Sequence, residues 1–341
     1  MNKKYTFLFF SVLLFFSCEN REYPYRTDSL NSNGGFPQSP QNLTIFNSIY
    51  DDYNSDIERG MYDNNTFVFS SNRNSKGKDF DFVLYSMGIT YLYDKNVVSV
   101  YKSSNSTSLS GTVESMLLNI NTSSNQFGPY IYPLTYDINH TAEEFIFFYT
   151  QETNGTADIK YKLYRVNKIG YVTFGRYEGP YNLKLINTPK NESYISISNN
   201  KIYYCSDKDG NYDIYQLPID TTKNIVDFLS GEYSDKSEKI DILNSDKDDK
   251  CPLVKDNLMV FTSNRDGGLG GYDLYYSKFD GTNWEKPSNF GPNYNSEADE
   301  FRPIVVKYSQ VPNDLMIFSS NRKGGLGGFD LYYTGTDLLR K

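Results

Sequence analysis

Acidic side chains recur along the chain, and a pair of carboxylates is the set of groups that glycoside hydrolysis requires. One candidate falls in the predicted first strand of each of five similar segments: Glu58, Glu144, Glu192, Asp249 and Glu300. A catalytic site is seldom present in every copy of a repeat, so this recurrence favours a scaffold role. The sequence therefore predicts no catalytic residue and leaves enzymatic activity open, with a glycoside hydrolase or lyase as the alternative.

A second set of charged residues recurs with a fixed offset. Three aspartates each lie eight residues after an arginine of their segment, and a fourth lies five residues after Lys208; the residues are Arg73 with Asp81, Arg265 with Asp273, Arg322 with Asp330, and Asp213 alone. A carboxylate at the base of a hairpin can accept backbone N–H bonds and fix the turn. We assign these residues structural roles, with the arginines as possible partners of the aspartates. A ring of ligand-binding carboxylates is the alternative.

Metal and cofactor chemistry is poorly supported. Residues 207–213 have the acidic spacing of a calcium loop, but Tyr212 stands at its glycine position and Pro218 at that of its bidentate glutamate. His140 is the one histidine, so neither a catalytic triad nor a histidine-rich metal set is predicted. The glycines of 267–271 precede neither a helix nor a Lys-Ser/Thr pair, unlike a phosphate loop. We predict no metal and no cofactor.

The N-terminus predicts export. A short apolar run follows two lysines and ends at Cys18, which resembles the lipid-attachment cysteine of bacterial lipoproteins. We expect a signal peptide over residues 1–17, acylation of Cys18 that anchors the protein to a membrane, and a flexible tether over 18–40. Cys205 and Cys251 remain. Export permits a disulfide between them, but two buried free thiols are favoured.

These residues belong to a unit that repeats. Phe261 to Tyr276 returns almost letter for letter as Phe318 to Tyr333, two apolar segments joined by glycines. The residues at the Arg265 position are separated by 79, 56, 57 and 57 residues, the series being Arg73, Glu152, Lys208, Arg265 and Arg322. A fixed period in this range indicates a repeat architecture. The longer first interval predicts an insertion near residues 103–124, formed as a loop.

The strands carry adjacent apolar residues, which indicates that both faces are covered. Blades of a propeller stack face to face and meet this condition. A two-sheet sandwich is an alternative, but it leaves the period unexplained. We predict an all-β chain whose residues 41–341 form one β-propeller of five four-stranded blades, with six blades as the alternative. The last unit stops before its fourth strand, so residues near 41–47 are expected to supply that strand and close the ring.

The repeat resembles the PD40, or WD40-like, repeats of TolB-type propellers. The motifs are Ser263-Asn264-Arg265, Gly270 to Tyr276, and Asp299 to Pro303, and they are similar to those of propeller lipoproteins from Bacteroidetes-type bacteria. The resemblance implies a lipid-anchored protein of the outer membrane, on its periplasmic or surface face. It implies a binding or scaffold propeller for an envelope protein or a glycan. The OmpA-like domain of many relatives is expected to be missing. The net charge of −8 argues against a nucleic-acid partner.

Overall fold

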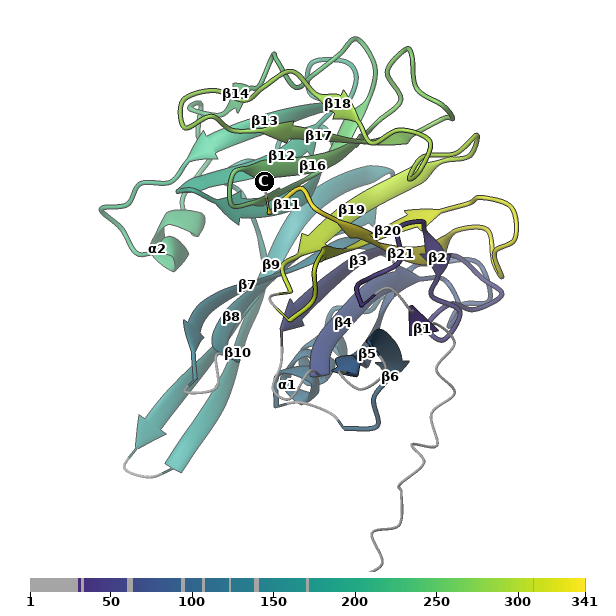
Figure 1. Cartoon of the computed structure of the whole chain (residues 1–341). Coiled ribbons are helices and arrows are strands. Elements are labelled where there is room, and N and C mark those ends of the chain that lie inside the picture. The colour runs from purple at the N-terminus through teal and green to yellow at the C-terminus, as the bar shows by residue number, and fades with distance from the viewer. Residues whose placement is uncertain are drawn as a thin grey trace, which may run out of the picture.

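The chain folds as a five-bladed β-propeller (Figure 1). The computed structural model describes residues 30–31, 34–59, 64–92, 96–105, 108–122, 124–137, 141–169, 172–308 and 310–340. Each blade is an antiparallel sheet whose successive strands are ordered from the axis outward. The predicted fold, all-β with five blades, is confirmed. Within the described ranges no helix is long and apolar enough to cross a bilayer.

The blades follow one another along the chain, and the last one is completed by the N-terminus. From the axis outward the strands are β3 (Asp52–Arg59), β4 (Asn64–Ser71), β5 (Asp81–Leu92), β6 (Val97–Lys102) and β1 (Leu30–Asn31) in blade 1; β7 (Asn125–Tyr136), β8 (Ala142–Thr153), β9 (Thr156–Ile169) and β10 (Val172–Asn182) in blade 2; β11 (Glu192–Ser198), β12 (Lys201–Ser206), β13 (Asp213–Pro218) and β14 (Glu238–Lys239) in blade 3; β15 (Asp249–Lys255), β16 (Leu258–Ser263), β17 (Asp273–Lys278) and β18 (Ser288–Asn289) in blade 4; β19 (Glu300–Val306), β20 (Asp314–Ser320), β21 (Asp330–Thr336) and β2 (Gln41–Asn42) in blade 5. Two helices, α1 (Ser108–Leu117) and α2 (Ile225–Leu229), lie between strands.

Neighbouring blades bury their apolar faces against each other. Every residue of β4, β16 and β20 is buried, which explains the continuous apolar runs of the sequence. One cluster joins blades 1 and 5 around Phe67 and Phe318, and another joins blades 3 and 4 around Tyr203 and Phe261. Burying a side chain of this size contributes about 2 kcal/mol. The core of the propeller therefore consists of apolar clusters, several of which join neighbouring blades.

The N-terminal segment closes the ring as predicted. Strand β2 pairs with β21, and Figure 1 shows the purple N-terminal strand beside the yellow C-terminal one. Leu43 and Phe46, which follow β2, are only 2% and 1% exposed. Phe36, which the sequence assigns to the tether, is also buried, and its N–H donates to Asn313 Oδ1 at 2.8 Å. Contact with the propeller thus begins before residue 41.

An asparagine clamp holds the third strand of every blade. In each clamp the side chain accepts a hydrogen bond from the N–H of one strand residue and donates one to its carbonyl oxygen, over 2.7–3.1 Å; the pairs are Asn47 with Leu331, Asn121 with Phe82, Asn187 with Ile159, Asn244 with Ile214, and Asn295 with Leu274. Each asparagine opens the motif Asn-Ser/Thr-x-x-Asp/Asn-Asp/Glu/Gln. The motif is also present for blade 2, where the arginine motif is degenerate. Asn47 shows that the N-terminal segment carries the same motif and clamps the last blade.

A β-bulge interrupts every inner strand at the same place. The extra residue has a φ between +51° and +58° in each blade; the residues are Asn54, Gly128, Tyr194, Cys251 and Arg302. A bulge bends its strand and re-aims the side chains that follow. The residues beyond the five bulges therefore meet around the axis at one end of the propeller.

The glycine-rich connections pack against the start of the next blade. A Cβ atom on Gly270 would lie 2.0 Å from the carbonyl oxygen of Ala298, and one on Gly327 would lie 2.0 Å from that of Tyr50. Positive φ angles occur at Gly267 and Gly324. The repeated glycines therefore serve close approach between blades as well as chain reversal.

The predicted insertion is not a loop throughout. Residues 108–117 form α1, whose Leu109, Val113 and Met116 are buried in one cluster with Phe145 and Phe147 of β8. The prediction of a loop is wrong here because frequent serine and threonine hid an apolar spacing typical of a helix.

Blade 2 is larger than its neighbours. Its four strands have 12, 12, 14 and 11 residues, whereas β11 has seven and β12 six. Figure 1 shows these teal strands reaching beyond the other blades at lower left. Blade 2 therefore extends past the other blades at the end of the propeller where the inner strands finish.

Candidate functional site

An axial cavity of about 550 Å³ opens where the inner strands end. All five inner strands, or the turns that follow them, contribute to its walls. Its charged and aromatic lining residues are Asp56, Glu58, Tyr130, Tyr132, Tyr136, Lys255, Asp256 and Lys307. The remaining walls are largely aliphatic. Apolar walls with a few convergent polar groups are typical of a small-molecule site.

Asp56 is the buried acid of this cavity. Its side chain is 7% exposed, and its Oδ2 accepts the backbone N–H of Ile131 at 2.7 Å. Burial raises the pKa of Asp56 to about 6, while the Ile131 N–H and the charges of Arg302 and Lys255 oppose part of that rise. Asp56 is therefore protonated in mildly acidic solution, as a general acid must be.

Glu58 is a second carboxylate on the same strand. It lies two residues after Asp56 on the regular part of β3, where Asp56 pairs with Val68 and Glu58 with Thr66. Alternate residues of a strand share a face, and their Cα atoms are about 7 Å apart. Inverting glycosidases hold their two carboxyl groups about 6.5–9.5 Å apart, which leaves room for a water molecule. The Cα separation of Asp56 and Glu58 is at the lower end of that range, and the side-chain conformers set the separation of the carboxyl groups themselves.

Arg302 binds the backbone of β7, the strand that contacts Asp56. It is fully buried, and its Nη2 donates to the carbonyl oxygen of Pro129 at 3.0 Å. Two residues further along β7, Ile131 makes its hydrogen bond to Asp56. The guanidinium carbon of Arg302 lies 5.5 Å from the ring centroid of Tyr194. Arg302 thus holds β7 in place and supplies the positive charge that limits the pKa of Asp56.

Three tyrosines of β7 form an aromatic wall. The Tyr130 hydroxyl donates to the carbonyl oxygen of Ile197 at 3.1 Å and accepts its N–H at 3.2 Å, so this ring is fixed. The ring centroid of Tyr132 lies 6.5 Å from that of Tyr130. Tyr136 is 55% exposed at the mouth. These rings offer flat apolar faces with polar edges to a ligand in the cavity.

The opposite end of the axis is filled by aromatic rings. The ring of Tyr53 lies 5.1 Å from Phe80, 5.7 Å from Phe127 and 5.6 Å from Phe329, between centroids. Phe301 contacts Tyr194 and Tyr272 in the same way. One end of the axis is therefore packed, and the other carries the cavity with its carboxylates.

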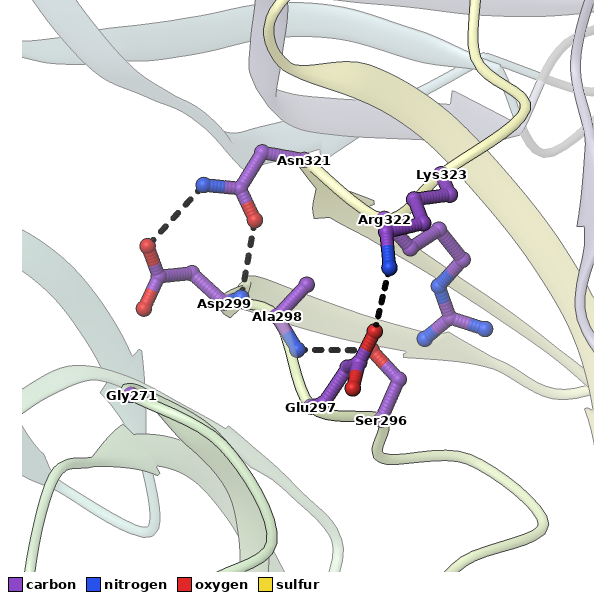
Figure 2. Close-up of a pocket in the computed structure, with 8 residues that line it drawn as sticks. All are labelled: Gly271, Ser296, Glu297, Ala298, Asp299, Asn321, Arg322 and Lys323. Atoms are coloured by element: carbon purple, nitrogen blue, oxygen red, sulfur yellow. Dashed lines mark hydrogen bonds and ion pairs between the residues drawn. The ribbon is translucent and has the colours of Figure 1, made fainter.

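A second cavity, of about 630 Å³, lies between blades 4 and 5 at the packed end (Figure 2). Its polar groups are used in the fold. Asp299 and Asn321 exchange two hydrogen bonds, of 2.8 and 3.0 Å, and Glu297 forms an ion pair with Lys323 at 2.9 Å. Asp51 and Asn72 form the same pair in blade 1, so this corner belongs to the repeat.

Of the five acids considered from the sequence, Glu58 alone lines the axial cavity. Glu192, Asp249 and Glu300 are fully buried. Each accepts the N–H and hydroxyl of a serine or threonine four residues earlier, namely Thr188, Ser245 and Ser296. Glu144 lies in β8 and accepts the N–H of Val166 at 2.8 Å.

The arginines do not pair with the third-strand aspartates, and that prediction is wrong. Each pairs with the acid that begins the inner strand of its own blade; the pairs are Arg73 with Asp52 at 2.6 Å, Arg265 with Asp249 at 2.5 Å, and Arg322 with Glu300 at 2.9 Å. The reason is the antiparallel pairing, which places the end of the second strand beside the start of the first. Sequence offset alone did not reveal this neighbour.

The third-strand aspartates contact their own hairpins. Asp273 accepts the N–H groups of Leu269 and Gly270, and Asp330 accepts those of Leu326 and Gly327. Asp213 instead binds Lys239 at 2.6 Å, and burial raises the pKa of Asp81 at the start of β5. Their structural role stays a prediction, which the hairpin contacts support.

The remaining sequence candidates are dispersed. Asp207 accepts hydrogen bonds from Asn191, and Asp209 accepts one from Tyr215, so the acids of 207–213 serve separate partners. Within the described part of the chain no acidic or histidine cluster could hold a metal. Cys205 and Cys251 are buried free thiols in one cluster. Cys18 and His140 lie outside the described residues.

Asp56 was missed from the sequence. It occupies the fourth position after the residue that ends the clamp motif, where the other blades have Tyr130, Ser196, Leu253 and Ile304. The signal that reveals it is departure from the repeat: an acid stands where no other blade carries a charge. Recurrence marks residues that build the blades, and a non-recurrent polar residue at a recurrent position marks a site.

Comparison with known proteins shows similarity of fold. No family model and no curated protein matches the chain. An α-L-arabinofuranosidase of Podospora anserina, solved with cellotriose, is 10% identical over 88% of this chain and 97% of its own, with a TM-score of 0.46. The catalytic domain of a GH62 α-L-arabinofuranosidase from Coprinopsis cinerea is 11% identical over 89% and 98%, with a TM-score of 0.47. A GH43_12 protein from a capybara gut metagenome is 16% identical over 90% and 54%, with a TM-score of 0.44.

The binding or scaffold function expected from the sequence is corrected. The similar solved structures named above include two α-L-arabinofuranosidases, and this likeness concerns the fold. The expectation rested on acids that recur in each blade, and three of those acids indeed serve the fold. The axial cavity, however, holds three carboxylates that do not belong to this set of buried acids, namely Asp56, Glu58 and Asp256.

Proposed function

We propose that the chain is a glycoside hydrolase that acts in the axial cavity. The observation that carries this proposal is the pairing of a buried carboxyl group, Asp56, with Glu58 two residues along the same strand, in a cavity that all five blades line. Asp56 has a pKa of about 6 because it is buried. Glu58 is nearer to solvent.

In the proposed reaction Asp56 donates its proton to the glycosidic oxygen as the bond from that oxygen to the anomeric carbon breaks. A water molecule attacks the anomeric carbon from the opposite face and loses a proton to Glu58. The products are a free sugar and an alcohol. Both carboxyl groups then return to their starting states by proton exchange with solvent.

The test is the stereochemistry of hydrolysis. The purified protein is offered a panel of nitrophenyl glycosides and polysaccharides, and the first product is followed by proton NMR. We expect inversion at the anomeric carbon, because a water molecule activated by Glu58 would attack in a single displacement. Retention would overturn the role of Glu58 as a base, and the absence of hydrolysis across the panel would overturn the proposal.

We further propose that the chain is a PD40-type, TolB-like propeller of a Bacteroidetes-type bacterium, anchored at the outer membrane through Cys18. The repeat motifs and the cysteine that follows the apolar N-terminal run support this assignment. A single acyl chain binds membranes weakly, so anchoring needs the two or more chains of a mature lipoprotein. The membrane is the expected partner, and the acidic chain is not expected to bind nucleic acid.

Replacing Cys18 by alanine is expected to release the protein from membranes, because the acyl chains would have no attachment point. Membrane and soluble fractions of cells are probed for the unmodified chain, the Cys18→Ala protein and an Asn20→Ala control, which keeps Cys18. The control is expected in the membrane fraction. Membrane retention of the Cys18→Ala protein would count against the lipid anchor.

A further inference from the structure

Two lysines of the axial cavity have no part in the proposed reaction. Lys255 ends β15 and Lys307 follows β19, so they come from neighbouring blades. Both are exposed, and neither side chain forms an ion pair or hydrogen bond with another described residue. Both are therefore available to a ligand.

The place of Lys255 in the repeat is not explained by the fold. The positions equivalent to Lys255 hold Glu58, Tyr132, Ser198 and Val306, so no structural rule of the blade requires a cation there. The chain as a whole carries a net charge of −8. Two lysines that line one cavity of an acidic protein, with no partner among the described residues, are thus a local feature of this site.

Lys255 lies within electrostatic reach of the catalytic acid. Its charge favours the ionised form of Asp56, which works against proton donation. A ligand anion that pairs with Lys255 would cancel this effect and favour the protonated acid. The arrangement therefore suits a substrate that brings its own negative charge, whereas a neutral substrate would leave Lys255 acting against Asp56.

We propose that the substrate is a glycan bearing an acidic group, a carboxylate or a sulfate, which Lys255 and Lys307 bind while Asp56 and Glu58 act on a nearby glycosidic bond. This inference rests on the proposed function. The tyrosines of β7 line the same cavity and accept the uncharged faces of the sugar rings.

The test compares glycans that differ in charge alone. Polygalacturonate is paired with its methyl-esterified form, glucuronoxylan with its carboxyl-reduced form, and carrageenan with its desulfated form. Binding is measured by affinity electrophoresis with the Asp56→Asn protein, so that no substrate is consumed, and hydrolysis is measured with the unmodified protein. Lys255→Met and Lys307→Met are compared with Lys286→Met, which removes an exposed lysine of blade 4 outside the cavity.

We expect an acidic glycan to bind about tenfold more tightly than its neutral partner, and each cavity variant to lose about tenfold in affinity, because a hydrogen bond to a charged group is worth about 1.4 kcal/mol or more. The Lys286→Met protein should bind as the unmodified protein does. Added salt should weaken binding of the acidic glycan of each pair and leave binding of the neutral glycan unchanged. Preference for polygalacturonate or glucuronoxylan would indicate a carboxylate, and preference for carrageenan a sulfate.

The outcomes separate this inference from the proposed function. Hydrolysis of a neutral glycan, unaffected by Lys255→Met or Lys307→Met, would overturn the acidic substrate and leave the hydrolase standing. Lysine-dependent binding of an acidic glycan without any cleavage would support the acidic ligand and overturn the hydrolase. Neither binding nor cleavage of any glycan would overturn both.

Discussion

Asp56→Asn is expected to lower kcat/KM for glycoside hydrolysis by about 10²–10⁴-fold, the usual contribution of a general acid. Asparagine can still accept the Ile131 N–H, so the cavity should keep its shape. In the unmodified protein activity should fall as the pH rises through about 6, because the donor form of Asp56 is lost there. The measurement is a pH profile of kcat/KM for both proteins.

The same substitution should stabilise the fold in neutral solution. The pKa of Asp56 is raised on folding to about 6 by burial, so its contribution to stability is full at low pH and is lost as the pH rises through about 6. Asparagine has no charge to bury. At about pH 8 the variant should be more stable by an amount of the order of 3 kcal/mol, and at about pH 4 the two proteins should be nearly equal.

Asp256→Asn is the matched control for this prediction. Asp256 also lines the cavity, but it is exposed and lies in the turn after β15. It should retain activity within a few-fold and show no pH-dependent gain in stability. An Asp56→Asn protein that remains active, or that loses activity through unfolding in a thermal melt, would contradict the assignment of Asp56 as the acid.

Removal of residues 34–47 is expected to prevent the propeller from forming. The deletion takes away β2, leaves the edge of β21 unpaired, and exposes the core that Phe36, Leu43 and Phe46 cover. It also removes Asn47, which clamps the N–H and carbonyl of Leu331. Limited proteolysis and circular dichroism of the truncated chain should show an unfolded or rapidly cleaved product.

A point variant gives the closure a measurable free energy. Phe46→Ala is expected to lower the free energy of unfolding by about 3–5 kcal/mol, because it leaves a cavity in a closed core. Ile49→Ala is the control, since Ile49 is 75% exposed nearby on the chain. Denaturant titration measures both. Equal stability of the two variants, or a truncated chain that melts like the full one, would show that the N-terminal segment is dispensable.

The two ends of the axis explain how a scaffold pattern and a reactive site coexist. At the packed end, rings such as Tyr53 and Phe301 pack between blades, and the recurring acid–arginine pairs join strands within a blade. At the other end the strands have passed their bulges, and the repeat no longer dictates which residues follow. Asp56 and Glu58 occupy those free positions, and therefore a rule based on recurrence pointed away from them.

The sequence by itself determined the architecture. Period, apolar runs and glycine-rich connections specify five stacked blades, because each unit carries the same local pattern and can bury its faces only against its neighbours. The last repeat unit lacks a fourth strand, which likewise predicts that the N-terminal segment completes the ring. Strand β2 does so. Local spacing was enough for all of this, since it depends on contacts within a unit and between adjacent units.

Tertiary structure alone decided the partners and the site. Arg265 meets Asp249 instead of Asp273 because antiparallel pairing joins strand ends that are distant in sequence. The lining of the axial cavity comes from five strands spread between residues 56 and 307, and Asp56 becomes a candidate acid only because Ile131 and the closing walls bury it. Burial and convergence around an axis are properties of the assembled ring, and no single segment of the chain contains them.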